Sequence, residues 1–373
     1  MGYSKHRKLN AILITLFAVF AGLYFGASFL EPFAFAAFLA TLVVPFTNWL
    51  EQKGAGRMVS SLIGTFVVFV VVSGFAVMLS FQLSRFLEDI PEMQEAAVDL
   101  LEKVQDYFYG VTGISPSKQT ELLRERSDQI TGAVQEYLTT FVSNTAFASL
   151  KFLLVIIYLF LFLLSRDKFA EVVLMYAPGE EQDKAKKTLD ESTKVAYHYL
   201  WGRIKVMLAL AAMYIITFWA FGTPYAVLLT MFGAIITIIP YIGPLLSGVL
   251  PVCLMLVFTD DFNTVLLFAG VVLVVQLIES YVLEPVIIGS EIRLSPLAVI
   301  VAVIIGGQVW GMAGMILFVP LLAIFKIISD NVESLHPIGY LLGNKESKEN
   351  KNGPGIWKKV KHFFQARTSH NSH

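Results

Sequence analysis

Charged residues are scarce in this sequence, and their scarcity argues against a water-soluble globular protein. Asp, Glu, Lys and Arg make up 15% of the 373 residues, whereas hydrophobic residues make up 56%. A soluble protein has roughly 25% charged residues, because its surface faces water. The formal net charge is −1, so the chain also lacks the excess of basic residues with which proteins bind nucleic acid. The composition therefore predicts an integral membrane protein that contacts the lipid bilayer and no nucleic acid.

Reactive side chains and catalytic motifs are also missing. The single cysteine, Cys253, excludes an intrachain disulfide and is expected to be a small apolar filler. All six histidines lie outside the apolar runs, and the sequence contains no HExxH, GxSxG or Walker A motif. An intramembrane protease would lack its base or metal ligands here, and ATP binding within this chain would lack its motif. We therefore expect no enzymatic activity and no metal site.

Apolar runs long enough to cross a membrane recur along the chain. A crossing helix needs about 20 residues, because the hydrocarbon core is about 30 Å thick and each residue rises about 1.5 Å. The runs expected to cross are 11–30, 33–49, 58–81, 146–164, 206–221, 225–239, 245–258 and 265–283. Two further arms, 297–305 and 310–328, flank Gly306 and Gly307 and predict a re-entrant or broken helical hairpin with its break at these glycines. The predicted class is an all-α membrane protein with about eight transmembrane helices.

Two polar segments differ from these runs. Between residues 83 and 145 charge returns, and apolar residues recur at helical spacing on both sides of a Gly- and Pro-containing break, which predicts an extramembrane amphipathic helical hairpin. The tail 345–373 has seven Lys or Arg against two Glu, and it is either an interfacial helix on anionic lipid or a disordered tail. The expected divisions are 1–82 (N-terminal transmembrane helices), 83–145 (the hairpin), 146–205 (a transmembrane helix and a cytoplasmic amphipathic segment), 206–330 (the C-terminal transport core) and 331–373 (the basic cytoplasmic tail).

The distribution of basic residues predicts the orientation. The N-terminal cluster, Lys53 with Arg57, the 166–205 loop and the tail all carry Lys or Arg, whereas the 83–145 hairpin has eleven acidic and five basic residues. Cytoplasmic segments are enriched in Lys and Arg. If the basic segments are placed on the cytoplasmic side, successive runs cross the membrane in alternating directions. We therefore expect a multi-pass protein of a bacterial inner membrane, with both termini cytoplasmic and the hairpin on the periplasmic side.

Glu279 is the main candidate for a transport residue. It lies in an apolar run, three residues after Gln276 and on the same helix face. A carboxyl group in apolar surroundings favours its neutral form and can exchange a proton, which suits a proton- or cation-coupled carrier. The alternative is a carboxylate at a helix end that pairs with a neighbour such as Arg293. Glu284, just before Pro285, is either a second transport residue or a residue of the helix boundary.

Helix-breaking residues are the second candidate feature. Pro240, Tyr241, Gly243 and Pro244 interrupt apolar sequence, so that backbone groups need partners outside a regular helix. In transporters such breaks often lie beside the solute path, and the alternative is a tight turn between two spans. Further breakers are Pro285, Gly289, Gly306, Gly307, Gly311, Gly314 and Pro320. The spacing of the glycines at 307, 311 and 314 is also typical of close helix packing.

These residues resemble the motifs of the AI-2E transporter family. The matching stretches are IPYIGP at 239–244, QLIESYVLEP at 276–285, VIIG at 286–289, LSP at 294–296, and the glycines and proline of 306–320. The family often has Asn after the glutamate and His before the proline, where this chain has Ser280 and Ser295. The resemblance implies a homo-oligomeric helical carrier, expected as a pentamer, without a bound cofactor. We place Gln276, Glu279, Glu284 and Tyr241 on its transport path.

Three functions are compatible with the sequence. Family members are linked to export of the quorum signal autoinducer-2 and to Na⁺(Li⁺)/H⁺ antiport. We expect a secondary transporter that exports a small polar solute such as autoinducer-2. An antiporter that moves monovalent cations and protons through Glu279 is the alternative, although only this acid lies well inside a span. The third possibility is a membrane scaffold that binds a partner through the 83–145 hairpin.

Overall fold

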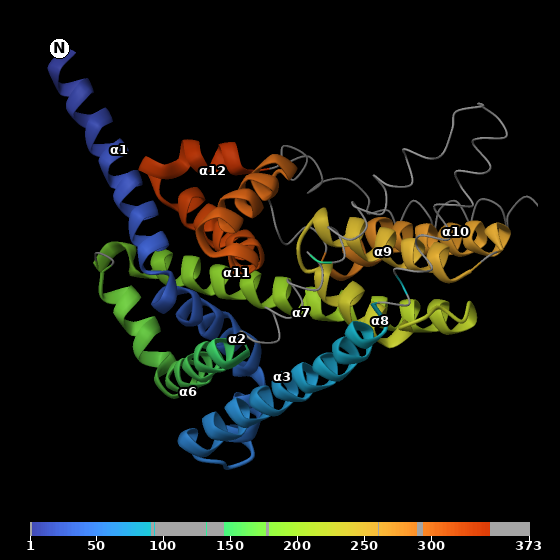
Figure 1. Cartoon of the computed structure of the whole chain (residues 1–373). Coiled ribbons are helices and arrows are strands. Elements are labelled where there is room, and N and C mark those ends of the chain that lie inside the picture. Colours follow the sequence, from blue (N-terminus) through green and yellow to red (C-terminus); the bar gives the residue numbers. More distant parts are fainter. Residues whose placement is uncertain are drawn as a thin grey trace, which may run out of the picture.

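Helices make up the architecture of the chain. The computed structural model describes residues 2–90, 93, 132, 145–176, 179–259, 261–288 and 294–343. In chain order the elements are α1 (Gly2–Phe25), α2 (Ala27–Gln52), α3 (Arg57–Glu88), α6 (Thr145–Met175), η1 (Gly179–Glu181), α7 (Gln182–Ala220), α8 (Ala226–Ile236), α9 (Ile242–Phe258), α10 (Phe262–Ile278), η2 (Glu279–Ile288), α11 (Pro296–Asn331), η3 (Glu333–Leu335) and α12 (His336–Leu342) (Figure 1). These residues contain no β-strand, so the predicted all-α class is confirmed for this part of the chain.

Five helical segments among the described residues are long and apolar enough to cross a membrane. They are α2, α3, α7, the α10–η2 segment Phe262–Ile288, and α11. Three shorter apolar helices accompany them: Leu13–Phe25, α8 and α9. The α8 helix has 11 residues and rises about 16 Å, about half the thickness of the hydrocarbon core. It therefore does not supply the full crossing expected of residues 225–239, and the count of about eight spans stays a prediction.

Two predicted segments lie almost wholly outside the described residues. One is the amphipathic hairpin 83–145, of which the structure describes only the two ends and two isolated positions. The other is the basic tail 345–373. Their predicted structures and the scaffold function assigned to the hairpin stay predictions.

The α7 helix is the central element of the fold. It is 39 residues long, about 58 Å, and it contacts α2, α6, α8, α10, η2 and α11. Figure 1 shows it running between α2, α3 and α6 on one side and α9 and α10 on the other. Val206, Leu210, Tyr214 and Phe218 recur at helical spacing on its buried face and form a core cluster with α8, α9 and α10. The helix is continuous across residues 205 and 206, where the sequence predicts a boundary.

The α11 helix is broken into two arms. Trp310 (φ −130°, ψ 19°) and Gly311 (φ 59°, ψ −140°) leave the helical conformation. The backbones of Gly306 and Gly314 are in direct contact, which a straight helix does not allow for residues eight apart because they lie about 12 Å apart along its axis. The arms therefore fold back on each other. The predicted break at Gly306 and Gly307 is wrong in position: the turn is at Trp310 and Gly311, since glycine accepts a positive φ without steric strain.

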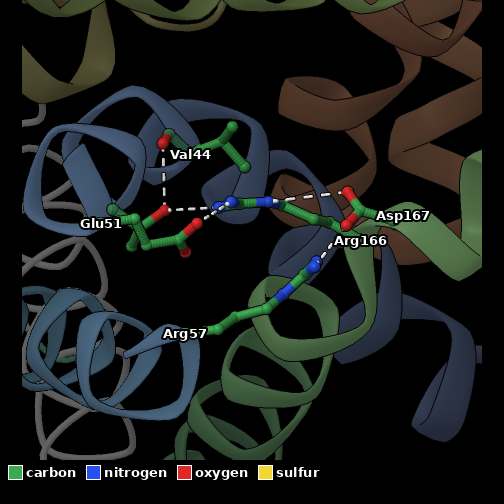
Figure 2. Close-up of polar contacts among 6 residues, drawn as sticks. Val44, Glu51, Arg57, Arg166 and Asp167 are labelled. Carbon is green, nitrogen blue, oxygen red and sulfur yellow. Dashed lines mark hydrogen bonds and ion pairs between the residues drawn. The ribbon is translucent and has the colours of Figure 1, made fainter. Parts of the chain in front are cut away.

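A network of ion pairs joins α2, α3 and α6 at one end. Arg166 donates to Glu51 Oε2 at 2.6 Å and to Thr47 Oγ1 at 3.0 Å, and Arg57 pairs with Asp167. Figure 2 shows the Arg166 side chain reaching from α6 towards Glu51, with Asp167 beside it. The hydrogen bond from Arg57 holds the pKa of the Asp167 carboxyl below its ordinary value. Because this folded-state pKa is depressed, the pair stabilises the fold at neutral pH and loses its effect only as the pH falls through the lowered value.

Removal of Arg166 is expected to destabilise this group of helices. Arg166→Gln leaves the Glu51 carboxylate, which is three-quarters buried, without its cation, and we expect a loss of about 2 kcal/mol in detergent. The matched control is Lys168→Gln, which removes an exposed base of the same helix that has no ion pair among the described residues, and should change stability by less than about 0.5 kcal/mol. Thermal unfolding followed by circular dichroism measures both. Equal losses in the two variants would contradict a structural role of the network.

Candidate functional site

The segment 240–244 forms a strained turn between α8 and α9. Tyr241 has φ 67° and ψ −45°, and the N–H of Ile242 donates to the Pro240 carbonyl at 2.8 Å. This geometry is that of a γ-turn with positive φ, which is rare for a residue with a side chain. A Cβ on Gly243 would overlap the last carbonyl of α8, so glycine is required there. The segment is thus a tight turn, and it carries the exposed Tyr241 side chain.

A chain of hydrogen bonds connects this turn to α7 and α10. The Tyr214 hydroxyl donates to Ser247 Oγ at 3.1 Å, and Ser247 Oγ donates to the Pro244 carbonyl at 3.2 Å. The same carbonyl accepts from Gln276 Nε2 at 2.5 Å. Tyr214 and Ser247 are buried. These four residues, called the Pro244 cluster below, bring donors and acceptors from three helices together inside apolar surroundings.

Glu279 is a fully buried acid at the point where the helix changes type. It is the first residue of η2, a π-helix, and its exposed fraction is 0%. Neither carboxyl oxygen has a hydrogen-bond partner among the described residues. Burial of an unpaired acid is costly, and π-helical turns are frequent at functional sites. Arg293, the partner considered from the sequence, lies outside the described residues.

A buried arginine stands opposite this acid. Arg203 of α7 is 4% exposed and pairs through Nη1 with Glu284 Oε1 at 2.6 Å. Its Nε and Nη2 are buried without a hydrogen-bond partner among the described residues. Both Arg203 and Glu284 lie near enough to Glu279 to act on its charge. Two buried charged residues, Arg203 and Glu279, and the partly exposed Glu284 therefore interact with one another, and we call these three residues the charge triad.

The remaining predicted residues lie in two places. Pro285 is inside η2, and Gly289 is outside the described residues. Gly306, Gly307, Gly311, Gly314 and Pro320 all belong to the α11 hairpin. The hairpin reaches the site indirectly, because Ala302, Val303 and Val319 pack against Tyr199 of α7 and against Ile239. Packing is the only role that the contacts of these glycines show.

Three residues of the site were not predicted from the sequence. They are Arg203, Tyr214 and Ser247. A signal for Arg203 was present, because it precedes Val206, Leu210 and Tyr214 at spacings of three and four residues on the apolar face of one helix. A charge on such a face needs a buried partner. No comparable pattern marks Ser247, whose role depends on the fold.

The described residues include no group of three or more His, Cys, Asp or Glu side chains arranged to hold a metal ion. The site instead combines an ionisable triad with hydroxyl, amide and carbonyl groups. Such a site can bind and release protons or cations and can hydrogen-bond to a polar solute. Its polar groups do not include an activated nucleophile beside a base, which is the arrangement that covalent catalysis needs.

Comparisons with known proteins agree with a membrane carrier. A family model described as "AI-2E family transporter" matches residues 13–334. The chain is 27% identical over 345 residues to the AI-2 transport protein TqsA of Escherichia coli (strain K12), covering 91% of this chain and 97% of that protein. It is 26% identical over 306 residues to YrrI of Bacillus subtilis (strain 168), covering 80% and 84% respectively. YhhT of Escherichia coli (strain K12) is 23% identical over 339 residues, with 89% and 93% covered.

Proposed function

This chain belongs to the AI-2E transporter family and is a multi-pass bacterial membrane transporter, and from that premise we propose that it exports a small polar solute of the autoinducer-2 type across the inner membrane. The observation that carries the proposal is the similarity to an AI-2 transport protein along nearly the whole of both chains. The site supports it chemically. The Pro244 cluster offers hydroxyl, amide and carbonyl groups, which suit a solute with several hydroxyl groups.

The path in this proposal passes between the Pro244 cluster and the charge triad. Glu279 is sealed from solvent in this structure, so export requires an opening on each side in turn. The α11 hairpin packs against Tyr199 and Ile239, and we expect it to be the moving element. In this scheme the hairpin is re-entrant, both termini are cytoplasmic, and the protein is a homo-oligomer with a pentamer as its expected form. The mass of the detergent-solubilised protein tests whether it is a pentamer.

The proposal is tested by solute efflux from reconstituted vesicles. Purified protein is reconstituted into liposomes loaded with a panel of small polar solutes that includes autoinducer-2, which a luminescent reporter detects outside. The expected result is a faster loss of autoinducer-2 than from protein-free liposomes, with little loss of solutes that lack its hydroxyl groups. Efflux rates equal to those of empty liposomes for every solute would refute export.

Gly248→Ala is expected to impair transport through Gln276. A Cβ at this position would overlap the Gln276 side-chain amide and displace it from the Pro244 carbonyl. We expect efflux to fall about tenfold, since loss of a buried hydrogen bond costs about 1–2 kcal/mol. Gly270→Ala in α10 is the control, because its Cβ would meet no atom within 4 Å. Unchanged efflux in Gly248→Ala, measured beside this control, would remove Gln276 from the path.

Na⁺(Li⁺)/H⁺ antiport is the second candidate function. The observation that favours it is the buried carboxyl of Glu279, whose two oxygens are free of hydrogen bonds within the described part of the chain. Vesicles that hold a pH gradient and a fluorescent pH indicator distinguish the two functions. Antiport predicts that added Na⁺ or Li⁺ dissipates the gradient in the absence of organic solute. Export alone predicts that the gradient persists until autoinducer-2 is supplied.

A further inference from the structure

Two carboxyl groups, the buried Glu279 and the partly exposed Glu284, compete for one guanidinium in the charge triad. Arg203 pairs with Glu284 through Nη1, and its Nε and Nη2 are buried without a hydrogen-bond partner among the described residues. Glu279 is the more deeply buried of the two acids, at 0% exposure, while the Glu284 side chain is 40% exposed. Glu284 is therefore the less enclosed of the two acids, whereas an ionised Glu279 needs a cation.

The π-helix brings the two acids of η2 towards one side of that helix. Residues five apart, such as Glu279 and Glu284, point about 140° apart around an α-helix of 3.6 residues per turn. In a π-helix the hydrogen bond runs from residue i to residue i+5, so these two positions stack over one turn. The segment Glu279–Ile288 is in this conformation. The wider turn of the π-helix therefore brings the Glu284 carboxyl group to the same face of the helix as the Glu279 carboxyl group.

Close packing of α7 against η2 brings Arg203 to this face. Gly202, the preceding residue, is buried, and a Cβ there would lie 3.2 Å from Ile288 Cγ1 and 3.5 Å from the Ile287 carbonyl oxygen. A larger side chain would push the helices apart. Among the described residues, the other titratable groups that interact with the triad come from α7: Tyr199 interacts with Arg203 and Glu284, and Tyr214 with Glu279. Arg203 is thus the cation that acts on both acids within the described residues.

We propose that Arg203 is a shared counter-ion, which pairs with Glu284 while Glu279 is protonated and moves to Glu279 when that acid is ionised. The structure shows Arg203 paired with Glu284 and leaves both Glu279 oxygens without a partner among the described residues. The exchange moves Nε or Nη2 of Arg203 onto a Glu279 oxygen and releases Glu284 from its ion pair. In terms of the transport function proposed above, on which this role rests, the exchange links the protonation of Glu279 to the packing of α7 on η2. Arg203 is a positioning residue in this scheme.

The proposal is tested by carbodiimide labelling of Glu279 in the purified protein. A hydrophobic carbodiimide reacts with protonated carboxyl groups in apolar surroundings, and mass spectrometry of the peptide that contains Glu279 measures the product at one fixed pH. Glu279→Gln identifies the labelled position. In Glu284→Gln, Arg203 loses its competitor and pairs with the ionised Glu279. We expect labelling to fall about tenfold, the effect of a cation within hydrogen-bond reach.

A second variant separates counter-ion exchange from structural damage. Arg203→Gln/Glu284→Gln removes the cation as well, and labelling should return to at least the wild-type level. The matched control is Asp330→Asn, which removes a carboxylate of similar exposure from another buried base, Lys326, and should leave Glu279 labelling unchanged. Unchanged labelling in Glu284→Gln, or a fall that persists in the double variant, would overturn the proposal.

Should Glu284→Gln fail to fold, Glu284→Asp weakens the same pair, and it must then give a smaller fall in the same direction. The absence of any fall in that variant would also overturn the proposal. Labelling needs no transported solute, so a failure of the vesicle assays would reject the transport function and leave the counter-ion result standing.

Discussion

Glu279→Gln is expected to abolish efflux of the solute while leaving the protein folded. The amide has nearly the shape of the carboxyl group but can neither ionise nor exchange a proton. We expect efflux to fall about 100-fold, to the level of empty liposomes, because the variant lacks the only fully buried acid of the site. The wild-type carboxyl has no hydrogen-bond partner among the described residues, so a neutral amide should leave the thermal unfolding temperature unchanged or higher.

The combination of lost transport with unimpaired stability is the informative result. Replacement of a residue that serves only the fold would impair both transport and stability, or neither of them. Glu171→Gln, which replaces an exposed acid on α6, is the matched control and should transport as the wild type does. Wild-type efflux in Glu279→Gln would exclude Glu279 from the mechanism, and loss of the folded protein would show that the acid has a structural partner.

Gly314→Ala is expected to have the largest effect on stability. The added Cβ would overlap the carbonyl group of Gly306 on the facing arm of the α11 hairpin. Backbone cannot move aside as a flexible side chain does, so the two arms must separate. We expect a loss of about 3 kcal/mol, at the upper end of overpacking effects, together with loss of the contacts of Val303 and Val319 with Tyr199.

Gly307→Ala in the same helix is the control for helix propensity and position. Its Cβ would meet the end of the Met315 side chain, which is flexible and can rotate away. We expect a change of less than about 1 kcal/mol. Thermal unfolding in detergent measures both variants. Similar unfolding temperatures for Gly314→Ala and Gly307→Ala would mean that the arms are not in contact in the protein.

The sequence allowed the general layout to be predicted because apolar runs report membrane burial directly. Their boundaries were harder to predict. Glu31 and Pro32 were expected to separate the first two spans, yet Pro32 lies inside α2 and the interruption is at Gly26. A transmembrane helix tolerates proline where neighbouring groups satisfy the freed carbonyl. Gly26 is instead suited to the interruption because the backbone of Gly22 lies close to it: a Cβ at position 26 would be 2.6 Å from the Gly22 carbonyl oxygen.

The acids of the candidate site could be predicted, whereas the pairing of Glu284 with Arg203 could not. Glu279 and Gln276 stand out as polar residues in an apolar run. Arg203 is 81 residues from Glu284 in the sequence, and their pairing depends on how α7 packs. The π-helix was also beyond prediction, because sequence periodicity assumes 3.6 residues per turn. Its wider turn depends on the contacts of η2 with α7 and α10 rather than on local propensity.

The most direct test of the central claim asks whether the solute reaches the buried acid. Carbodiimide labelling of Glu279 is measured in purified wild-type protein with increasing concentrations of autoinducer-2, and with a small apolar compound as the control. If the path runs between the Pro244 cluster and the charge triad, autoinducer-2 should slow the labelling in a saturable way, and the control compound should not. A labelling rate that is independent of autoinducer-2 at every concentration would contradict a transport site at Glu279.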